Sequence, residues 1–209
     1  NLTVTNSVGC KATFPFTLNA PSAGLSITTK STNIDCFGQS TGQIQTTTTG
    51  GRTPYSYTWS NGSTLANLSN LPAGNFTVTV TDQSGCGDTA SVNILQNPAI
   101  STTINASNPA CFGQTNGQVS VTVSGGSPAY SYLWSTGATT TAITGLAAGK
   151  YVLTVTDALR CTKKDSAQLT APSQLQLTVS ATNVNCNGTA TGSAQGVVTG
   201  GTATYTYAW

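Results

Sequence analysis

The 209-residue sequence contains no histidine and no methionine, and its five acidic residues are all aspartate. Charged side chains make up only 6% of the residues, and the formal net charge is +2. Without histidine or glutamate no general base stands out, so we do not expect an enzyme. Seven cations spread over the whole length also cannot form the dense positive patch that nucleic-acid binding requires.

Long apolar runs and good helix formers are scarce as well. No apolar run approaches the length of a membrane span, so none is expected in this sequence. The first residues, 1–4, lack the basic and apolar regions of a signal peptide. Thr, Val, Ile and Tyr are plentiful, which favours strands over helices. Disordered chains lack aromatics and carry a high net charge, so the recurring aromatics here indicate a folded, all-β protein.

The residues that are present repeat with a period of 75. Cys36, Cys111 and Cys186 are spaced by this step, and a second cysteine series at 10, 86 and 161 follows with steps of 76 and 75. Chance does not place so many rare residues in register. Further series with the 75-residue step are Trp59, Trp134 and Trp209; Tyr55, Tyr130 and Tyr205; Tyr57, Tyr132 and Tyr207; and Gly51, Gly126 and Gly201.

Short linkers after Pro21, Pro98 and Pro172 divide the sequence into repeats. Residues 23–98 and 99–173 form two complete repeats. Residues 1–22 correspond to the C-terminal part of a preceding repeat, and residues 174–209 to the N-terminal part of a following one. We therefore expect a segment of a longer array, with small domains arranged end to end.

Within the first complete repeat, alternating apolar residues and turn signals predict six short strands. Such spacing is typical of a β-sandwich. The Asn61-Gly62 pair predicts a direct hairpin between the third and fourth strands. The expected strands are 25–30, 43–49, 55–59, 63–70, 76–80 and 90–95.

Three aromatics lie on one face of the third strand in each repeat. They could form an exposed platform on which sugars stack, or they could be part of the sandwich core. Polar residues at the alternate positions favour the core. The expected core residues are Tyr55, Tyr57, Trp59, Tyr130, Tyr132 and Trp134.

The cysteines are expected to form disulfides, because a repeat of this size buries too little apolar surface to be comfortably stable. If the strands form a meander, Cys36 pairs with Cys86 and Cys111 pairs with Cys161 inside each repeat. We expect this arrangement. An immunoglobulin-type crossover would instead put the two cysteines of a repeat at opposite ends, and Cys36 would pair with Cys161.

The two outermost cysteines, Cys10 and Cys186, are expected to pair outside this sequence. The sequence contains neither a CxxC spacing nor a histidine, so nothing in it indicates a zinc site. Asp82 and Asp157 end a strand at matching positions, where a carboxylate caps the following turn through backbone hydrogen bonds. Calcium ligation by these two residues is the weaker reading, because one aspartate per site is few of the six to eight oxygens required. We expect no metal and no cofactor.

The combined motif resembles the SprB repeat of Bacteroidota surface proteins, and the resemblance covers essentially the whole chain. Its parts in the first repeat are Cys-Phe-Gly at 36–38, Gly-Gly at 50–51, Pro-Tyr-Ser-Tyr-Thr-Trp-Ser at 54–60, the run from Asn70 to Asp82, and Gly-Cys at 85–86. The second repeat follows the pattern. The third departs from it at Asn187 and at Ala203-Thr204, which lie in loops.

The resemblance implies tandem Ig-like β-sandwich repeats of a long cell-surface protein, secreted by the type IX system and found in gliding adhesins or related extracellular fibres. In such proteins the repeats form the stalk, which makes neighbouring repeats of the same chain the first expected partners. Lateral self-assembly into a filament stays open. The alternative function is a repeated carbohydrate- or surface-binding module, with surface glycans as partners.

The lineage suggested by the resemblance also draws attention to a short glycosylation motif. Asp88-Thr89-Ala90 and Asp165-Ser166-Ala167 match the Asp-Ser/Thr-small pattern of O-glycosylation in Bacteroidota. Thr89 and Ser166 are therefore candidate O-glycosylation sites.

Overall fold

The computed structural model describes residues 1–17, 23–188 and 190–209, and every regular element in these ranges is a β-strand. The expected repeat boundary after Pro21, between residues 22 and 23, touches positions outside the described residues. The chain divides into two compact units. One contains Asn1–Ile34 and Gly38–Gln96, and the other contains Asp35–Phe37 and Asn97–Trp209.

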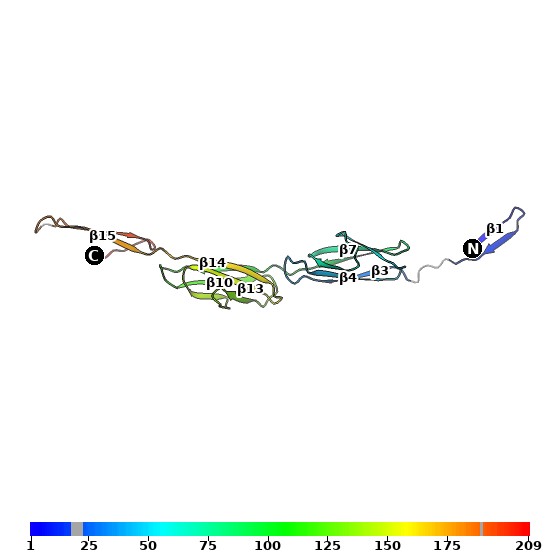
Figure 1. Ribbon diagram of the computed structural model, residues 1–209, viewed down its shortest axis with the longest axis horizontal. Helices are drawn as coiled ribbons and strands as arrows, with labels where there is room; N and C mark the ends of the chain where they lie inside the picture. The colour runs from blue at the N-terminus through cyan, green and yellow to red at the C-terminus, as the bar shows by residue number, and fades with distance from the viewer. Residues whose placement is uncertain (18–22, 189) are drawn as a thin grey trace. The chain divides into compact units, whose positions relative to one another are not determined.

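The first complete sandwich consists of two three-stranded antiparallel sheets (Figure 1). One sheet has the order β3-β4-β6, and the other has the order β5-β7-β8. The strands are β3 (Ser26–Thr32), β4 (Gly42–Thr49), β5 (Ser56–Trp59), β6 (Leu68–Leu71), β7 (Gly74–Thr81) and β8 (Gly87–Ile94).

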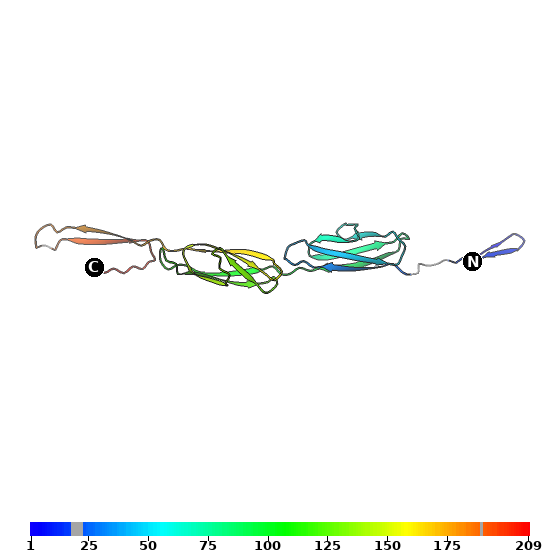
Figure 2. The ribbon, with the colours of Figure 1, turned by 60° about the horizontal axis from the view of Figure 1, so that its bottom comes forward.

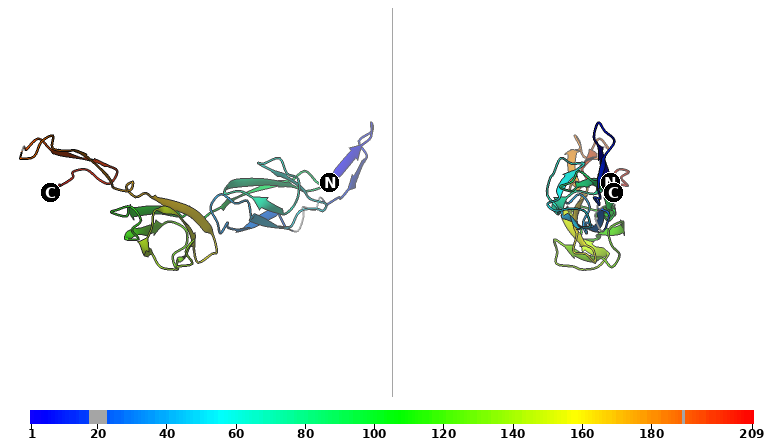
Figure 3. Two further views of the ribbon diagram at one scale, coloured as in Figure 1. Left: turned by 60° about the vertical axis from the view of Figure 1, so that its left-hand side comes forward. Right: turned by 90° about the vertical axis from the view of Figure 1, so that its right-hand side faces the viewer.

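The second sandwich repeats this plan one period later, with sheets β12-β10-β9 and β11-β13-β14. Figures 2 and 3 show its green to yellow strands from other sides. The chain changes sheet between the second and third strands, between the third and fourth, and between the fourth and fifth. This is the strand order of an Ig-like sandwich. The strands are β9 (Ser101–Ser107), β10 (Gly117–Ser124), β11 (Ser131–Trp134), β12 (Ala142–Leu146), β13 (Gly149–Thr156) and β14 (Thr162–Leu169).

Alternating side chains of the two sheets build each core. In β7, Phe76, Val78 and Val80 are buried while the threonines between them are partly or fully exposed, as a strand with one inner face requires. Val78, Val80 and Ile44 from the facing sheet are completely buried. The second sandwich has its own separate core of the same kind, around Val119, Leu153, Val155 and Leu169.

The expected meander is wrong, because the chain crosses to the other sheet after the third strand. Asn61-Gly62 does form a tight turn, in which the Trp59 N–H donates to the Ser63 carbonyl at 2.9 Å. The strand that follows, however, is only Leu68–Leu71 instead of the expected 63–70, and it pairs with β4 and not with β5. The residues between the turn and β6 form the segment that crosses from one sheet to the other.

This crossover decides which loops share an end of the sandwich. Gly42 pairs with Leu71, so the loop before β4 lies at the end where β7 begins. Ser56 pairs with Thr81, so the turn after β7 lies at the opposite end. The eight residues of β7 separate the two ends by roughly 26 Å, at about 3.3 Å per residue.

One hairpin precedes the two sandwiches in the chain and another follows them. β1 (Leu2–Thr5) and β2 (Lys11–Phe14) form a hairpin that matches the last two strands of a complete repeat. β15 (Gln176–Thr182) and β16 (Ser193–Thr199) form a hairpin that matches the first two. The side chains of β1, β2 and β15 are all exposed.

The Gly-Gly turn after the second strand is required by both conformation and space. Gly125 has φ +71°, and a Cβ there would lie 2.0 Å from the Ala99 carbonyl oxygen. The Gly125 carbonyl also accepts a 2.6 Å hydrogen bond from the Tyr130 hydroxyl, which fixes the start of β11. The first repeat has the same contacts at Gly50 and Tyr55.

We predict that Gly125→Ala destabilises the second sandwich by about 3 kcal/mol, because it adds a backbone overlap to the left-handed conformation. Gly137→Ala is the matched control, since Gly137 has φ +85° but nothing within 4 Å of its added Cβ. The control should cost about 1 kcal/mol. Urea denaturation followed through amide NMR signals of β13 measures both, and equal losses would contradict the prediction.

Candidate functional site

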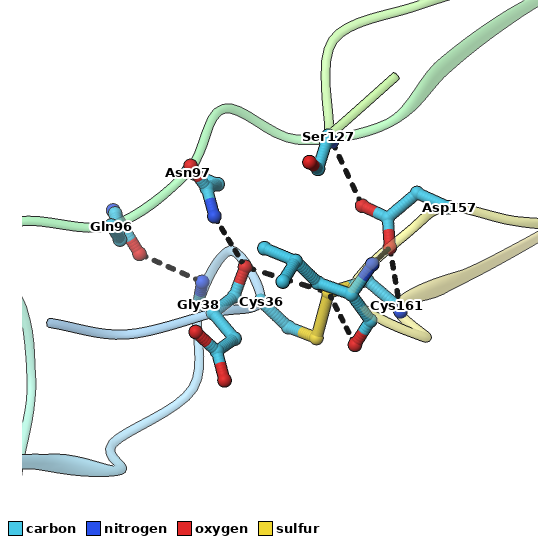
Figure 4. Close-up of a disulfide and its surroundings, with 9 residues drawn as sticks. Cys36, Gly38, Gln96, Asn97, Ser127, Asp157 and Cys161 are labelled. Carbon is cyan, nitrogen blue, oxygen red and sulfur yellow. Dashed lines mark hydrogen bonds between the residues drawn. A yellow bond between two sulfur atoms is a disulfide. The ribbon is translucent and has the colours of Figure 1, made fainter. Parts of the chain in front are cut away.

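A disulfide joins Cys36 to Cys161, with the two Cα atoms 5.5 Å apart and a sequence separation of 125 (Figure 4). Cys36 comes from the loop between β3 and β4 of the first repeat, and Cys161 from the turn between β13 and β14 of the second. Residues 35–37 belong to the same compact unit as Cys161. The bond therefore links two successive repeats covalently.

The expected pairs Cys36–Cys86 and Cys111–Cys161 are wrong, and the crossover is the reason. Cys36 precedes β4, and Cys86 follows β7 at the other end of the same sandwich. A disulfide needs its Cα atoms within about 4.4–6.8 Å, far less than the length of β7. The alternative that an immunoglobulin-type crossover implies, Cys36–Cys161, is confirmed.

Backbone and amide hydrogen bonds hold the loop that carries Cys36. The Ile34 N–H donates to the Leu95 carbonyl at 2.8 Å, and the Gly38 N–H donates to Gln96 Oε1 at 2.9 Å. Asn97 Nδ2 donates to the Asp35 carbonyl at 3.0 Å (Figure 4). The loop is thus tied on both sides of the cysteine to the segment that follows β8.

A buried carboxylate holds the turn that carries Cys161. Asp157 Oδ1 accepts the N–H groups of Leu159 and Cys161, both at 2.9 Å, and Oδ2 accepts the Ser127 N–H at 3.0 Å. Only 5% of Asp157 is exposed. Burial pushes the pKa of its carboxyl upward, but the three backbone N–H donors outweigh it and hold the pKa below its usual value.

Asp82 has the same role in the first repeat. Its oxygens accept the N–H groups of Arg52, Ser84 and Cys86 at 2.8–2.9 Å. The Arg52 N–H is the largest influence that lowers the pKa of this carboxyl, and burial acts in the opposite direction. The turn-capping role expected of both aspartates is confirmed, and it occupies the carboxylate oxygens that calcium ligation would need.

Three further cysteines, Cys10, Cys86 and Cys111, are exposed thiols. Cys86 sits in the turn that Asp82 holds, as Cys161 sits in the turn that Asp157 holds. Cys111 occupies the position of Cys36 one period later. The expectation that Cys10 and Cys186 have partners outside this sequence stays a prediction.

The tryptophans of the third strand lie in the cores. Trp59 and Trp134 are each 2% exposed, and their indole N–H groups donate to the carbonyls of Leu65 and Thr140 at 2.8 and 2.9 Å. The four tyrosines that recur with the 75-residue step in the complete repeats are partly buried and pack against the same clusters. These tyrosines are Tyr55, Tyr57, Tyr130 and Tyr132.

The aspartates of the candidate glycosylation motif connect the first and last strands of a repeat. Asp88 Oδ2 accepts the Ile27 N–H at 2.9 Å, and Asp165 Oδ2 accepts the Thr102 hydroxyl at 2.5 Å. The Thr102 hydroxyl is also the main cause that lowers the pKa of Asp165. Thr89 and Ser166 are exposed on the last strand, so both hydroxyls are accessible, which sequence reasoning had no means to establish.

One open cavity of about 870 Å³ lies along β15 and β16. Its walls include Leu177, Val198, Tyr205 and Trp209. Trp209 is 83% exposed here, whereas its counterparts Trp59 and Trp134 are buried. The side chains of β15 and β16 that line the cavity occupy positions that face the core in the two complete sandwiches, so we assign the cavity no ligand.

Within residues 1–17, 23–188 and 190–209, no three histidine, cysteine or acidic side chains gather as metal ligands would. The same residues contain no helix of the length and apolar character needed to cross a membrane. Every buried polar side-chain atom in the described part of the chain has a hydrogen-bond partner.

Comparison with known proteins identifies the repeat. A family model described as the SprB repeat matches residues 28–64, 103–139 and 178–209, which together make up half of the chain. No curated protein matches the chain.

Solved structures that are similar to parts of this chain have low sequence identity to it. A structure from work on Dscam isoform specificity is 12% identical over 66% of this chain, with a TM-score of 0.31. The N-terminal eight Ig domains of Down Syndrome Cell Adhesion Molecule isoform 1.30.30 are 12% identical over 71%, with a TM-score of 0.38. Domains 4–9 of the surface layer protein SbsC are 16% identical over 76%, with a TM-score of 0.29. The chain spans 42%, 25% and 32% of these three chains.

We predict that Asp157→Asn removes part of the pH dependence of the second sandwich. A carboxyl whose folded pKa is depressed stabilises the fold above the unfolded pKa of about 3.9, and that contribution is lost as the pH falls further. The urea midpoint of the wild-type second sandwich should therefore drop below about pH 3.9. The midpoint of the variant should be lower at pH 7 and change less on acidification.

The matched control is Asp35→Asn, which removes the same charge but keeps the Asp35 carbonyl that Asn97 binds. Its midpoint should follow the wild type at every pH. An Asp157→Asn curve parallel to the wild-type curve would contradict the role assigned to this carboxylate.

Proposed function

Because the chain belongs to the SprB repeat family, we propose that it is a stalk segment of a long bacterial cell-surface adhesin or extracellular filament that serves attachment or gliding. In this proposal the repeats act as spacers and carry out no catalysis. Neighbouring repeats of the same chain are their principal partners, and lateral assembly into a multi-chain filament is compatible with this role.

The observation that carries the proposal is the burial of the recurring aromatics. A repeated sugar-binding module would present these rings to solvent, where they could stack on pyranose faces. Instead both tryptophans of the complete repeats are 2% exposed, and their N–H groups are used inside the fold. The recurring tryptophans therefore stabilise the fold of each repeat and are not presented as a binding surface.

The polar side chains support the same conclusion. The carboxylates of Asp82, Asp88, Asp157 and Asp165 all accept hydrogen bonds that hold turns or join the edge strands. They are therefore engaged in structure, as expected of a spacer whose only task is to stay folded.

The disulfide supports an extracellular location. Structural disulfides persist in oxidising compartments and are rare in the cytosol. Cys36–Cys161 is fixed in place by hydrogen-bonded loops on both sides, as a permanent bond would be. Secretion by the type IX system is part of the proposal and follows from the family alone.

Exchange of the repeats for an unrelated spacer tests the stalk. In the host protein, replacing this segment with Ig-like domains of similar total length from another protein should preserve attachment, whereas deleting it should weaken attachment. If the unrelated spacer restores nothing, the repeats themselves contribute a specific surface and the stalk proposal fails.

A repeated binding module is the second candidate, and one observation favours it. Phe37 and Phe112 occupy matching positions in the Cys-Phe-Gly loops and are 58% and 59% exposed. An exposed ring that returns in successive repeats is a feature that a spacer does not need. The third repeat has Asn187 at this position.

The double variant Phe37→Ser/Phe112→Ser tests this alternative on a glycan array. Leu65→Ser is the matched control, because Leu65 is 66% exposed and has no counterpart at residue 140, which is a threonine. On the stalk proposal, the wild-type chain and both variants give the same background signal. Binding by the wild type and the control that is lost in the double variant would establish the binding module.

Thr89 and Ser166 are proposed to carry O-linked glycan in the native host. Both hydroxyls are exposed on the last strand, and the preceding aspartates are anchored by hydrogen bonds. Intact-peptide mass spectrometry of native material should find a glycan mass on the peptides with Thr89 and Ser166. Unmodified peptides at both sites would remove the proposal.

A further inference from the structure

The Cys36–Cys161 bond changes how tension travels through the chain. A pull on the two chain ends passes from residue 36 to residue 161 through one S–S bond, so residues 37–160 carry no covalent tension. This loop contains every strand from β4 to β13. Only β3 of the first sandwich and β14 of the second lie outside it.

Two exposed thiols have the same places in the repeat as the bonded pair. Cys111 lies one period after Cys36, and Cys86 lies one period before Cys161. The counterparts of both cysteines are therefore seen joined in a disulfide, in a register that links the first cysteine of one repeat to the second cysteine of the next. Neither thiol can form that bond with another cysteine of this sequence, because the required positions lie before residue 1 and after residue 209.

We propose that Cys86 and Cys111 are disulfide sites for further repeats of the same chain. Cys111 takes the second cysteine of the following repeat, and Cys86 takes the first cysteine of the preceding one. Each bond forms when two thiols lose two protons and two electrons to an external disulfide-carrying thiol oxidase. The same oxidant chemistry is already required for Cys36–Cys161.

In an array that continues this register, successive bonds overlap. The Cys36–Cys161 loop encloses Cys86 and Cys111, so the bonds of these two cysteines begin or end inside it. Alternate bonds then connect into two covalent paths, which the stretches of chain such as 36–86 and 111–161 join to each other. Each path alternates disulfides with short peptide segments. On one path these are segments such as 86–111, and on the other they are segments such as 161–186.

Extended strands make up most of the residues of these connecting segments. Segment 86–111 contains β8 and β9, and segment 161–186 contains β14 and β15. A β-strand rises about 3.3 Å per residue, close to the limit of about 3.6 Å for a stretched chain. Tension therefore gains little length from these segments, while most of each sandwich stays inside a closed loop.

A single cut in the peptide chain also leaves such an array in one piece, because each stretch between cysteines is bypassed by at least one bond. The inference concerns the bonding pattern and holds for a binding module as well as for a stalk. Exchange of the spacer tests the stalk, and the two experiments below test the bonds, so either proposal can fail alone.

The pairing is tested by peptide mapping of the native protein under non-reducing conditions, after free thiols are alkylated in denaturant. The peptide with Cys111 should be joined to the peptide with the second cysteine of the next repeat. The peptide with Cys86 should be joined to the peptide with the first cysteine of the preceding repeat. A Cys86–Cys111 peptide, or alkylation of either thiol, overturns the proposal.

The bypass of tension is tested by pulling the 209-residue chain at its two ends in a single-molecule force experiment. Without reductant, the fully stretched oxidised chain should be shorter by the 125-residue separation of the bonded cysteines. Reductant should release roughly 400–450 Å of additional length, at about 3.3–3.6 Å per residue.

Two cysteine variants complete the force experiment. Cys36→Ser should give the full length with or without reductant. Cys111→Ser removes a cysteine that is not bonded in this chain and should behave like the wild type, with the same gain on reduction. If the oxidised wild type already reaches the full length, the S–S bond does not carry the tension and the inference is wrong.

Discussion

In each sandwich, the indole of the third-strand tryptophan donates its N–H to a carbonyl in the loop that crosses between the sheets. Trp59 holds Leu65 and Trp134 holds Thr140 in this way. The ring fills the core, and its one polar atom fixes the crossing segment, so a single side chain serves packing and connectivity together. The crossing then determines that β6 pairs with β4 and that the cysteine loops lie at opposite ends. The inter-repeat bond follows from that separation.

The second interaction that recurs in both sandwiches is made by the buried aspartate after β7 and β13. Its oxygens collect N–H groups from the turn that follows and from the loop after the Gly-Gly pair. Because the second cysteine of the repeat donates its own N–H to this carboxylate, the position of the sulfur depends on a charge buried beside it. In a chain with so few charged residues, these carboxylates lie where backbone N–H groups would otherwise lack hydrogen-bond acceptors.

The local features of the fold were predictable from the sequence. The strands at 42–49 and 74–81 follow from alternation of apolar and polar residues, and the burial of Trp59 and Trp134 follows from their polar neighbours on the strand. The capping by Asp82 and Asp157 follows from their position at a strand end. Each of these depends on a few adjacent residues, so the pattern of side chains is sufficient to determine it.

The fourth strand and the disulfide were not predictable in this way. The alternation at residues 63–67 predicts a strand, but these residues form the crossing, where the Leu65 carbonyl accepts the hydrogen bond of the Trp59 indole N–H. Asn61-Gly62 forms the turn that its sequence predicts, yet the same turn can lead back along the sheet or across to the other one. The choice depends on contacts between residues far apart in the chain.

The sequence alone determined most of the strands, the period of the repeat, the turn residues and the family, because these depend on local residue types and their spacing. Only the tertiary structure decided that Cys36 pairs with Cys161 and not with Cys86. Spacing says how far apart two cysteines are along the chain, whereas a disulfide requires Cα atoms a few ångströms apart in space. That distance is set by which sheet each strand joins, and here it is the crossover after Trp59 and Trp134 that sets it.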